Sequence, residues 1–355
     1  MGSMNNQKTY DAILLAGEGK SSYKVHHQNK AFLTINGTCL IHYIVETLQK
    51  VESIQDIYVV GPKEKLQQAF LSGRIDLTSP KRIHIVEQKT NLYENIWHTF
   101  LQSLKNENGA RPNTDTHRDR AVLIVPCDAP LMTSQEVEYF ISHADMEKYD
   151  HVLGLVSREK LQHFYPQTKK PGIKMAYIHF KEDSFRLNNL HLVKPLRIEN
   201  REYIQKMYQY RYQRNFKNLV LLGLSLFGKD KARHYKNYVG LQLCLFFASL
   251  RLDFLVDFFR NLNPRKELEK IIGTIMKTRF KTLEVPYPGA ALDIDNAKDY
   301  DAMKIQFYEW WKYLQEYKES LPVATSHIEV SPAARTEKVA RPSPTPLSTS
   351  SEHEG

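Results

Sequence analysis

The sequence predicts an α/β fold in which helices cover a mostly parallel sheet. Apolar segments of strand length recur in the first half of the chain, at positions 10–16, 57–60, 83–87 and 121–125. Amphipathic helical patterns alternate with them, at positions 40–51, 63–71, 92–104 and 134–141. Because the strands are apolar on both faces and a helical pattern follows each of them, we expect a parallel sheet buried between helices.

The second half of the chain interrupts this alternation. A further strand is predicted at 151–156, followed by a β-hairpin at 174–193 that is added to the sheet. A helical region from about 200 to 277, a strand at 282–285 and a last helix at 297–317 are predicted after it. Beyond residue 321 aromatic residues vanish and proline, serine and threonine increase, which is typical of disorder. We therefore expect an α/β core over 8–160, a β-hairpin part over 161–199, a helical insertion over 200–280, a return to the core with a C-terminal helix over 281–320, and a disordered tail over 321–355.

Composition narrows the classes of ligand. The formal net charge of +9 suits anionic ligands, but the basic residues are too evenly spread to indicate nucleic acid. Cys39, Cys127 and Cys244 lie far apart and form no CxxC pair, which favours reduced thiols over disulfides or a zinc site. No pattern of a secretory signal is present, so we expect a cytoplasmic protein.

The residues after the first predicted strand form a candidate cradle for a polyphosphate. They are Leu15, Ala16, Gly17, Glu18, Gly19, Lys20 and Lys24, and Lys30 follows where the polar loop rejoins an apolar segment. Glycine lets backbone N–H groups approach anionic oxygens closely, and lysine adds positive charge. The spacing does not fit a Walker A motif, whose first glycine would fall at Leu14. An ordinary βα turn with a solvated basic loop is the alternative.

Asp128 is the first candidate metal ligand. It lies between Pro126 and Pro130, directly after the strand predicted at 121–125. Ligands of open parallel sheets bind outside the carboxyl ends of the strands. An aspartate at this place can bind Mg²⁺ while substrate phosphates supply further ligands. A turn or helix cap without a metal is the alternative.

Asp293 and Asp295 are the second candidate metal ligands. In an extended segment their side chains point to the same side, and Ile294 points to the other. Asn296 and Asp299 have the spacing of a helix N-cap with a capping-box partner, so part of this acidity is explained by the helix that follows. Which of the two aspartates would bind a metal stays open.

Two polar groups are candidates for contacts with small molecules. Asn95 opens the helix after the third predicted strand, where it could bind a nucleotide base or only support the helix start. Polar and basic residues on and after the second hairpin strand suit a phosphorylated acceptor, although a solvated strand face would have the same composition; they are Arg186, Asn188, Asn189 and Lys194.

The helical insertion has no assigned chemistry. Its longest apolar run, 243–250, is far shorter than the roughly 20 residues needed to span a bilayer. A buried subdomain or a homodimer face is one use for it, and peripheral contact with a membrane surface is the other.

Three motifs in chain order resemble the nucleotidyltransferase superfamily of MobA-like NTP transferases, sugar-1-phosphate nucleotidyltransferases and inositol-phosphate cytidylyltransferases. Leu15-Ala16-Gly17-Glu18 followed by Asn29-Lys30 is similar to the family's Leu-Ala-Gly-Gly loop and lysine. The segments 126–130 and 293–299 are similar to its aspartate-bearing strand end and its late Asp-Ile-Asp motif. Glu18 stands where the family has a second glycine, and the loop lacks the family's arginine.

This resemblance implies a Rossmann-like, GT-A-type fold and a Mg²⁺-dependent nucleotidyltransferase. Lys30 and Asp128 would be catalytic, and Mg²⁺ would be bound by Asp128 with Asp293 or Asp295. The expected substrates are a nucleoside triphosphate, CTP or UTP on family grounds, and a sugar or polyol phosphate. The rival interpretations are a GT-A-type glycosyltransferase that uses a nucleotide-sugar and a nucleotide-binding module without catalysis.

Overall fold

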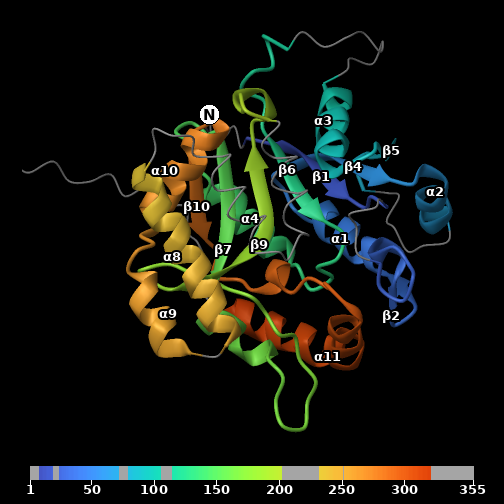
Figure 1. The fold of residues 1–355 in the computed structure, drawn as a ribbon. Helices are drawn as coiled ribbons and strands as arrows, with labels where there is room; N and C mark the ends of the chain where they lie inside the picture. Colours follow the sequence, from blue (N-terminus) through green and yellow to red (C-terminus); the bar gives the residue numbers. More distant parts are fainter. Residues whose placement is uncertain are drawn as a thin grey trace, which may run out of the picture. The chain divides into compact units, whose positions relative to one another are not determined.

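A central sheet organises the computed structural model, which describes residues 8–18, 24–71, 79–104, 114–201, 232–250 and 252–320. Within these residues the sheet has eight strands: β1 (Tyr10–Leu15), β4 (Ile54–Gly61), β5 (Ile83–Glu87), β6 (Val122–Pro126), β7 (His151–Ser157), β8 (Ile178–His179), β9 (Ser184–Val193) and β10 (Phe280–Glu284). Their order is β10-β7-β9-β6-β1-β4-β5, with β8 paired to β9 (Figure 1). All of these pairings are parallel except those of β9, which confirms the predicted mostly parallel sheet.

Strand β9 departs from the predicted hairpin. It pairs with β8 over only Ile178–His179, and it lies inside the main sheet, antiparallel to both β6 and β7. Leu190 and Leu192 of this strand are fully buried. A strand with neighbours on both edges and a buried apolar face is part of the core, so the hairpin is built into the sheet and is not appended to it.

Helices cover both faces of the sheet. The described helices are α1 (Leu40–Gln49), α2 (Lys63–Leu71), α3 (Leu92–Ser103), α4 (Ser134–His143), α5 (Arg158–Leu161), α8 (Ala232–Ser249), α9 (Asp253–Arg260), α10 (Arg265–Met276) and α11 (Ala297–Ser320). Helices α1, α2 and α4 bury Ile44, Leu66 and Phe140 in one core cluster. Helices α3 and α10 bury Phe100 and Met276 in another. Two layers of helices around a sheet are the architecture that the sequence predicts.

The helix starts follow local capping signals. The Thr133 hydroxyl accepts a hydrogen bond from the Glu136 N–H at 3.2 Å, which sets the start of α4. The Asn296 side chain likewise accepts from the Asp299 N–H at 3.1 Å at the start of α11. Satisfying these otherwise unpaired N–H groups stabilises a helix start by about 1 kcal/mol. Both starts were expected from the sequence.

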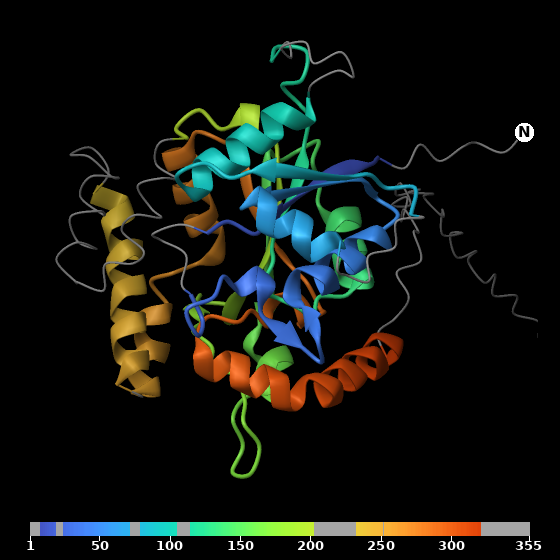
Figure 2. The same ribbon diagram turned by 90° about the vertical axis from the view of Figure 1, so that its right-hand side faces the viewer.

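Short elements between β1 and α1 adjoin the candidate site described in the next subsection. They are the 3₁₀ turn η1 (Lys30–Phe32) and a small antiparallel ribbon of β2 (Thr34–Ile35) and β3 (Thr38–Cys39). Helix α11 runs beside this ribbon (Figure 2), and the Tyr300 hydroxyl donates to the Thr34 carbonyl at 2.7 Å. The C-terminal helix α11 therefore supports the ribbon that follows the loop of the first motif, through the hydrogen bond of Tyr300.

Helices α8 and α9 pack against each other in the described part of the helical insertion. They carry exposed aromatic side chains at Phe246, Phe254 and Phe258. No helix among the described residues is long and apolar enough to cross a membrane.

Candidate active site

The first and second motifs meet where the parallel strands of the sheet end. We call this side of the sheet its carboxyl edge, and the side where these strands begin its amino edge. Strands β1 and β6 are parallel neighbours, and Leu15 is in register with Pro126. The residues that follow these two strands, Ala16 and Asp128 among them, therefore leave the sheet side by side. Such an edge is where open α/β sheets bind ligands.

Lys30 is directed at Asp128 by the turn that carries it. The Asn29 side chain accepts from the Ala31 N–H at 3.0 Å and donates to the Ala16 carbonyl at 3.0 Å, which ties η1 to the loop after β1. The Lys30 Nζ then lies 2.8 Å from Asp128 Oδ2 and 3.7 Å from Asp295 Oδ1. Lys30 thus joins two carboxylates from segments that are distant in the sequence.

Arg186 joins the third carboxylate to the same group. Its Nη2 lies 2.7 Å from Asp293 Oδ1 and 3.6 Å from Asp295 Oδ2, and its Nε donates to the Ala291 carbonyl at 2.9 Å. The Ile294 N–H donates to the Asp128 carbonyl at 2.9 Å, which fixes the late motif against the end of β6. We call Asp128, Asp293, Asp295, Lys30 and Arg186 the charged cluster.

Burial and charge act against each other in this cluster. Burial alone would lower the pKa of Lys30, but Asp128, Asp295 and Asp293 raise it above its ordinary value, so Lys30 is a permanent cation. Burial raises the pKa of Asp128, and Lys30 opposes that rise. Burial would also lower the pKa of Arg186, whereas Asp293 raises it. The cluster holds one more carboxylate than cations, which leaves it able to accept further positive charge.

Carboxylates of the charged cluster have the chemistry that Mg²⁺ requires of its protein ligands in nucleotide sites. No group of three His, Cys, Asp or Glu side chains in the described ranges is arranged to hold a metal by itself. Mg²⁺ in nucleotide sites commonly takes one or two carboxylates and obtains its other ligands from phosphates and water. Asp128 and Asp295 lie 2.8 and 3.7 Å from the Lys30 Nζ, so these two carboxylates are turned toward one point, as ligands of one ion would be.

The glycine loop is clamped by the segment after β5. The Gln88 side chain accepts from the Glu18 N–H at 2.6 Å and donates to the Glu18 carbonyl at 2.9 Å. A Cβ atom at Gly17 would lie 3.0 Å from the Asn95 Nδ2, so glycine permits the close approach of this buried amide. Asn95 also accepts from the Lys89 N–H. Leu15 to Glu18 thus form a fixed rim, while Gly19 and Lys20 lie outside the described residues.

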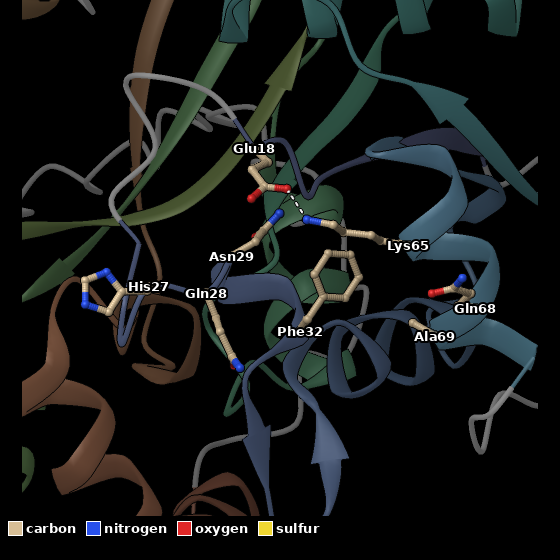
Figure 3. Close-up of a pocket in the computed structure, with 8 residues that line it drawn as sticks. All are labelled: Glu18, His27, Gln28, Asn29, Phe32, Lys65, Gln68 and Ala69. Atoms are coloured by element: carbon tan, nitrogen blue, oxygen red, sulfur yellow. Dashed lines mark hydrogen bonds and ion pairs between the residues drawn. The ribbon is translucent and has the colours of Figure 1, made fainter.

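Glu18 is paired with two lysines beside a cavity. Its carboxylate lies 3.2 Å from the Lys24 Nζ and 2.7 Å from the Lys65 Nζ. A cavity of about 530 Å³ opens next to this pair (Figure 3), and its lining also includes Asn29, Phe32 and Gln68. Lys24, expected as a nucleotide contact, is therefore engaged by a carboxylate of the same loop.

Two of the expected acceptor contacts lie elsewhere. Asn188 is fully buried against Gly154 and accepts from the Leu190 N–H at 3.2 Å, so it is a core residue. Lys194 follows Val193, which pairs with the first residues of β6 and β7, and it lies 3.4 Å from Asp119. Because β9 runs antiparallel to its neighbours, it ends at the edge of the sheet where β6 and β7 begin. Lys194 is therefore at the amino edge, away from the charged cluster.

The remaining acceptor candidates are at the carboxyl edge. Arg186 belongs to the charged cluster, and the Asn189 amide donates to the Ala290 carbonyl at 3.2 Å, in the turn that leads to Asp293. Asn189 has a φ of 61°, a conformation that asparagine tolerates better than most residues. It positions the late motif and is not turned toward solvent as a free donor.

Three residues of this edge were missed in the sequence. Gln88 directly follows the third predicted strand, and that position was the signal that could have identified it. Arg158 directly follows β7, is exposed, and has its guanidinium 5.8 Å from the centre of the Tyr177 ring with no carboxylate at ion-pair distance in the parts of the chain that the structure describes. Lys65 lies on the exposed side of α2, and no pattern in the sequence distinguishes it from its neighbours.

The fold and the charged cluster define an α/β protein whose glycine loop, lysine and carboxylates meet at one edge of a mostly parallel sheet, as in nucleotidyltransferases. A family model described as the MobA-like NTP transferase domain matches residues 12–211, which is more than half of the chain. The chain belongs to this family. The resemblance read from its motifs is thereby confirmed.

Three solved structures are similar to this chain at low sequence identity, and the first of them shares its fold. A hypothetical transferase from Thermus thermophilus is 20% identical, and the match covers 82% of this chain and 99% of that one with a TM-score of 0.53. CMP:2-keto-3-deoxy-manno-octonic acid synthetase complexed with CTP is 10% identical, with 85% and 100% covered and a TM-score of 0.42. 4-Diphosphocytidyl-2C-methyl-D-erythritol synthase from Anaerococcus prevotii is 12% identical, with 87% and 100% covered and a TM-score of 0.39. No curated protein matches the chain.

Proposed function

We propose that the protein transfers a nucleoside monophosphate from a nucleoside triphosphate to a phosphorylated small molecule, such as a sugar or polyol phosphate. The observation that carries this proposal is the ion pair of Lys30 with Asp128, 2.8 Å long, directly beside the clamped glycine loop. A polyphosphate lying along the loop would place its α-phosphate next to this pair. Family membership supports the same reaction class.

The reaction needs little covalent chemistry from the protein. An oxygen of the acceptor phosphate forms a bond to the α-phosphorus, the bond from that phosphorus to the bridging oxygen breaks, and pyrophosphate leaves with the electron pair. The protein therefore acts by positioning the reactants and by offsetting their negative charge. Lys30, held protonated by its carboxylates, supplies a fixed positive charge at this place.

Asp128 and Asp295 are the residues that we expect to hold Mg²⁺. The Asp293 side chain is only 13% exposed and lies against Arg186, whereas the Asp295 side chain is 54% exposed. A carboxylate that reaches solvent can bind a hydrated ion without breaking a buried ion pair. The ion would neutralise charge on the phosphates when bound. Between the two aspartates that the sequence left open, we therefore propose Asp295 as the metal ligand.

Arg158 and Arg186 form our proposed contact surface for the acceptor. Strand β7 pairs with β9 so that Val156 lies opposite Arg186, which places Arg158 close beyond it at the same edge. Guanidinium groups bind phosphate through two parallel hydrogen bonds. Because Arg158 has no carboxylate partner among the described residues, its charge is available to an anionic substrate. This replaces Asn188 and Lys194 in the expected acceptor set.

Release of pyrophosphate tests the proposed function. The wild-type protein is incubated with Mg²⁺, each of ATP, CTP, GTP and UTP, and a panel of sugar and polyol phosphates. We expect pyrophosphate with at least one pair, and CTP or UTP is the donor that we expect on family grounds. Thermal shift with the same triphosphates, with and without Mg²⁺, identifies the donor before an acceptor is known. Binding of a triphosphate without pyrophosphate release from any acceptor would contradict the proposal and favour a nucleotide-binding module.

A glycosyltransferase is the weaker candidate. That class uses an Asp-x-Asp pair at the end of a central strand, and here Pro126 stands two residues before Asp128 at the end of β6. Stabilisation by a nucleotide-sugar but by no triphosphate would favour it.

A further inference from the structure

Glu18 places a carboxylate at the rim of the glycine loop, where a triphosphate would place its own negative charge. The Gln88 amide accepts from the Glu18 N–H and donates to the Glu18 carbonyl, and these two hydrogen bonds fix the position of the Glu18 backbone. Its carboxylate contacts the ammonium groups of Lys24 and Lys65, at 3.2 and 2.7 Å. Figure 3 shows the Glu18 carboxylate and the end of the Lys65 side chain pointing toward each other, joined by a dashed line, with Asn29 beside them.

The charges at this place do not balance. Glu18 is the one carboxylate within ion-pair distance of Lys24 and of Lys65 among the described residues, and it serves both. Lys65 holds the pKa of Glu18 below its ordinary value, so the carboxylate is ionised at neutral pH, and two ammonium groups share this one carboxylate among the described residues. Such an excess of positive charge beside a cavity of about 530 Å³ is suited to an anion larger than a carboxylate.

The pair is also easy to exchange. The Lys65 side chain is 56% exposed and the Glu18 side chain 21% exposed. Ion pairs that water reaches are weak, because screening reduces their attraction and two long side chains must be ordered. A triphosphate with several ionised oxygens can therefore displace Glu18 from Lys65.

We infer that Lys65 of helix α2 binds the β- or γ-phosphate of the nucleotide, and that Glu18 occupies Lys65 as an internal competing anion when no nucleotide is bound. The inference rests on the proposed function and adds a binding residue from outside the motifs. It accounts for two departures from the family together: Lys65 supplies a cation in place of the arginine that the loop lacks, and Glu18, which stands at the family's second glycine, neutralises that cation in the free protein.

The test is the affinity for Mg²⁺–triphosphate without an acceptor, measured by calorimetry with each of ATP, CTP, GTP and UTP on the full chain. Lys65→Ala should weaken binding of the preferred triphosphate about tenfold, as loss of a charge-assisted hydrogen bond does. Glu18→Gln keeps the shape of the side chain and should strengthen binding about threefold, because the competing charge is gone. Lys63→Ala, an exposed lysine on the same helix, is the matched control and should leave the affinity unchanged.

The nucleoside monophosphate separates a phosphate contact from a general effect of charge. It lacks the β- and γ-phosphates, so Lys65→Ala and Lys63→Ala should bind it equally. An affinity for triphosphate in Lys65→Ala equal to that of Lys63→Ala would overturn the inference and leave the proposed function standing. If the wild type bound none of the triphosphates and released no pyrophosphate, both would fail. Equal thermal unfolding temperatures of the two lysine variants show that any difference does not come from the fold.

Discussion

The two edges of the sheet carry similar sets of charges and use them differently. At the amino edge Arg197 donates two hydrogen bonds to the Asp119 carboxylate, at 3.0 and 2.8 Å. Arg279 donates two to the Asp150 carboxylate, at 2.8 and 2.6 Å. At the carboxyl edge Arg186 gives one contact to Asp293, and its Nε bonds a backbone carbonyl.

This difference separates a structural network from a site. Two-pronged pairing engages both oxygens of a carboxylate and leaves fewer of its lone pairs for a ligand. In the charged cluster, by contrast, Asp295 is half-exposed, and Lys30 contacts each of its two carboxylates with one ammonium group. Similar residue types therefore stabilise the fold at one edge and remain available for chemistry at the other.

The largest expected effect comes from Asp128→Asn. It removes the carboxylate that contacts Lys30, and we expect pyrophosphate release to fall by about a thousandfold or more, since charge stabilisation is the main contribution of such a site. Asp119→Asn makes the same chemical change at the amino edge and should keep wild-type activity. Equal losses in the two variants would remove the distinction between the edges.

Asp295→Asn should lower activity by about a hundredfold and barely change stability, because this side chain is 54% exposed. Asp293→Asn should mainly affect the fold. It leaves the buried Arg186 without its closest carboxylate, which costs about 2 kcal/mol of unfolding free energy. Urea unfolding and pyrophosphate assays on both variants check this. The reverse pattern would assign the metal ligand to Asp293.

Arg279→Ala is the matched change at the amino edge. Its loss leaves the buried Asp150 with Lys194, 3.6 Å away, as its remaining cation, and we expect a destabilisation of about 1–2 kcal/mol. Activity measured well below the unfolding temperature should stay at the wild-type level. A drop in kcat without a drop in stability would link this edge to the reaction.

The smallest expected effect is a dependence of the unfolding free energy on pH that arises from a buried histidine at the amino edge. His151 begins β7 and is buried beside His191, 3.2 Å away, and burial holds its pKa well below the ordinary value near 6.5. The unfolded chain then binds a proton that the folded protein does not, so stability is present above about pH 6.5 and is lost as pH falls below it. His151→Leu should reduce this loss, by up to about 1.4 kcal/mol for each pH unit.

Urea unfolding at about pH 7.5 and pH 5.5 measures that effect. Lys30, with its raised pKa, does not change its charge in this range. An unfolding free energy of the wild type that did not change with pH would contradict the assignment to His151.

Much of the fold could be predicted because its signals are local. Periodicity identified the strands and helices of the first half, and the capping residues Thr133 and Asn296 marked where α4 and α11 begin. The place of Asp128 at a strand end followed from the apolar run before it. The hairpin was predicted less well, since its second strand pairs with β6 and β7, and no local pattern specifies such partners.

The sequence by itself thus determined the class of fold and the motifs that carry the candidate chemistry, because periodicity, caps and strand ends depend on neighbouring residues. The tertiary structure decided which charges meet. It brought Arg186 to Asp293 and Lys65 to Glu18, and it sent Lys194 to the opposite edge. These outcomes depend on the direction of β9 and on the packing of α2, which arise from contacts between residues far apart in the chain. Because long-range packing determines which charges pair, no local pattern in the sequence indicates these ion-pair partners.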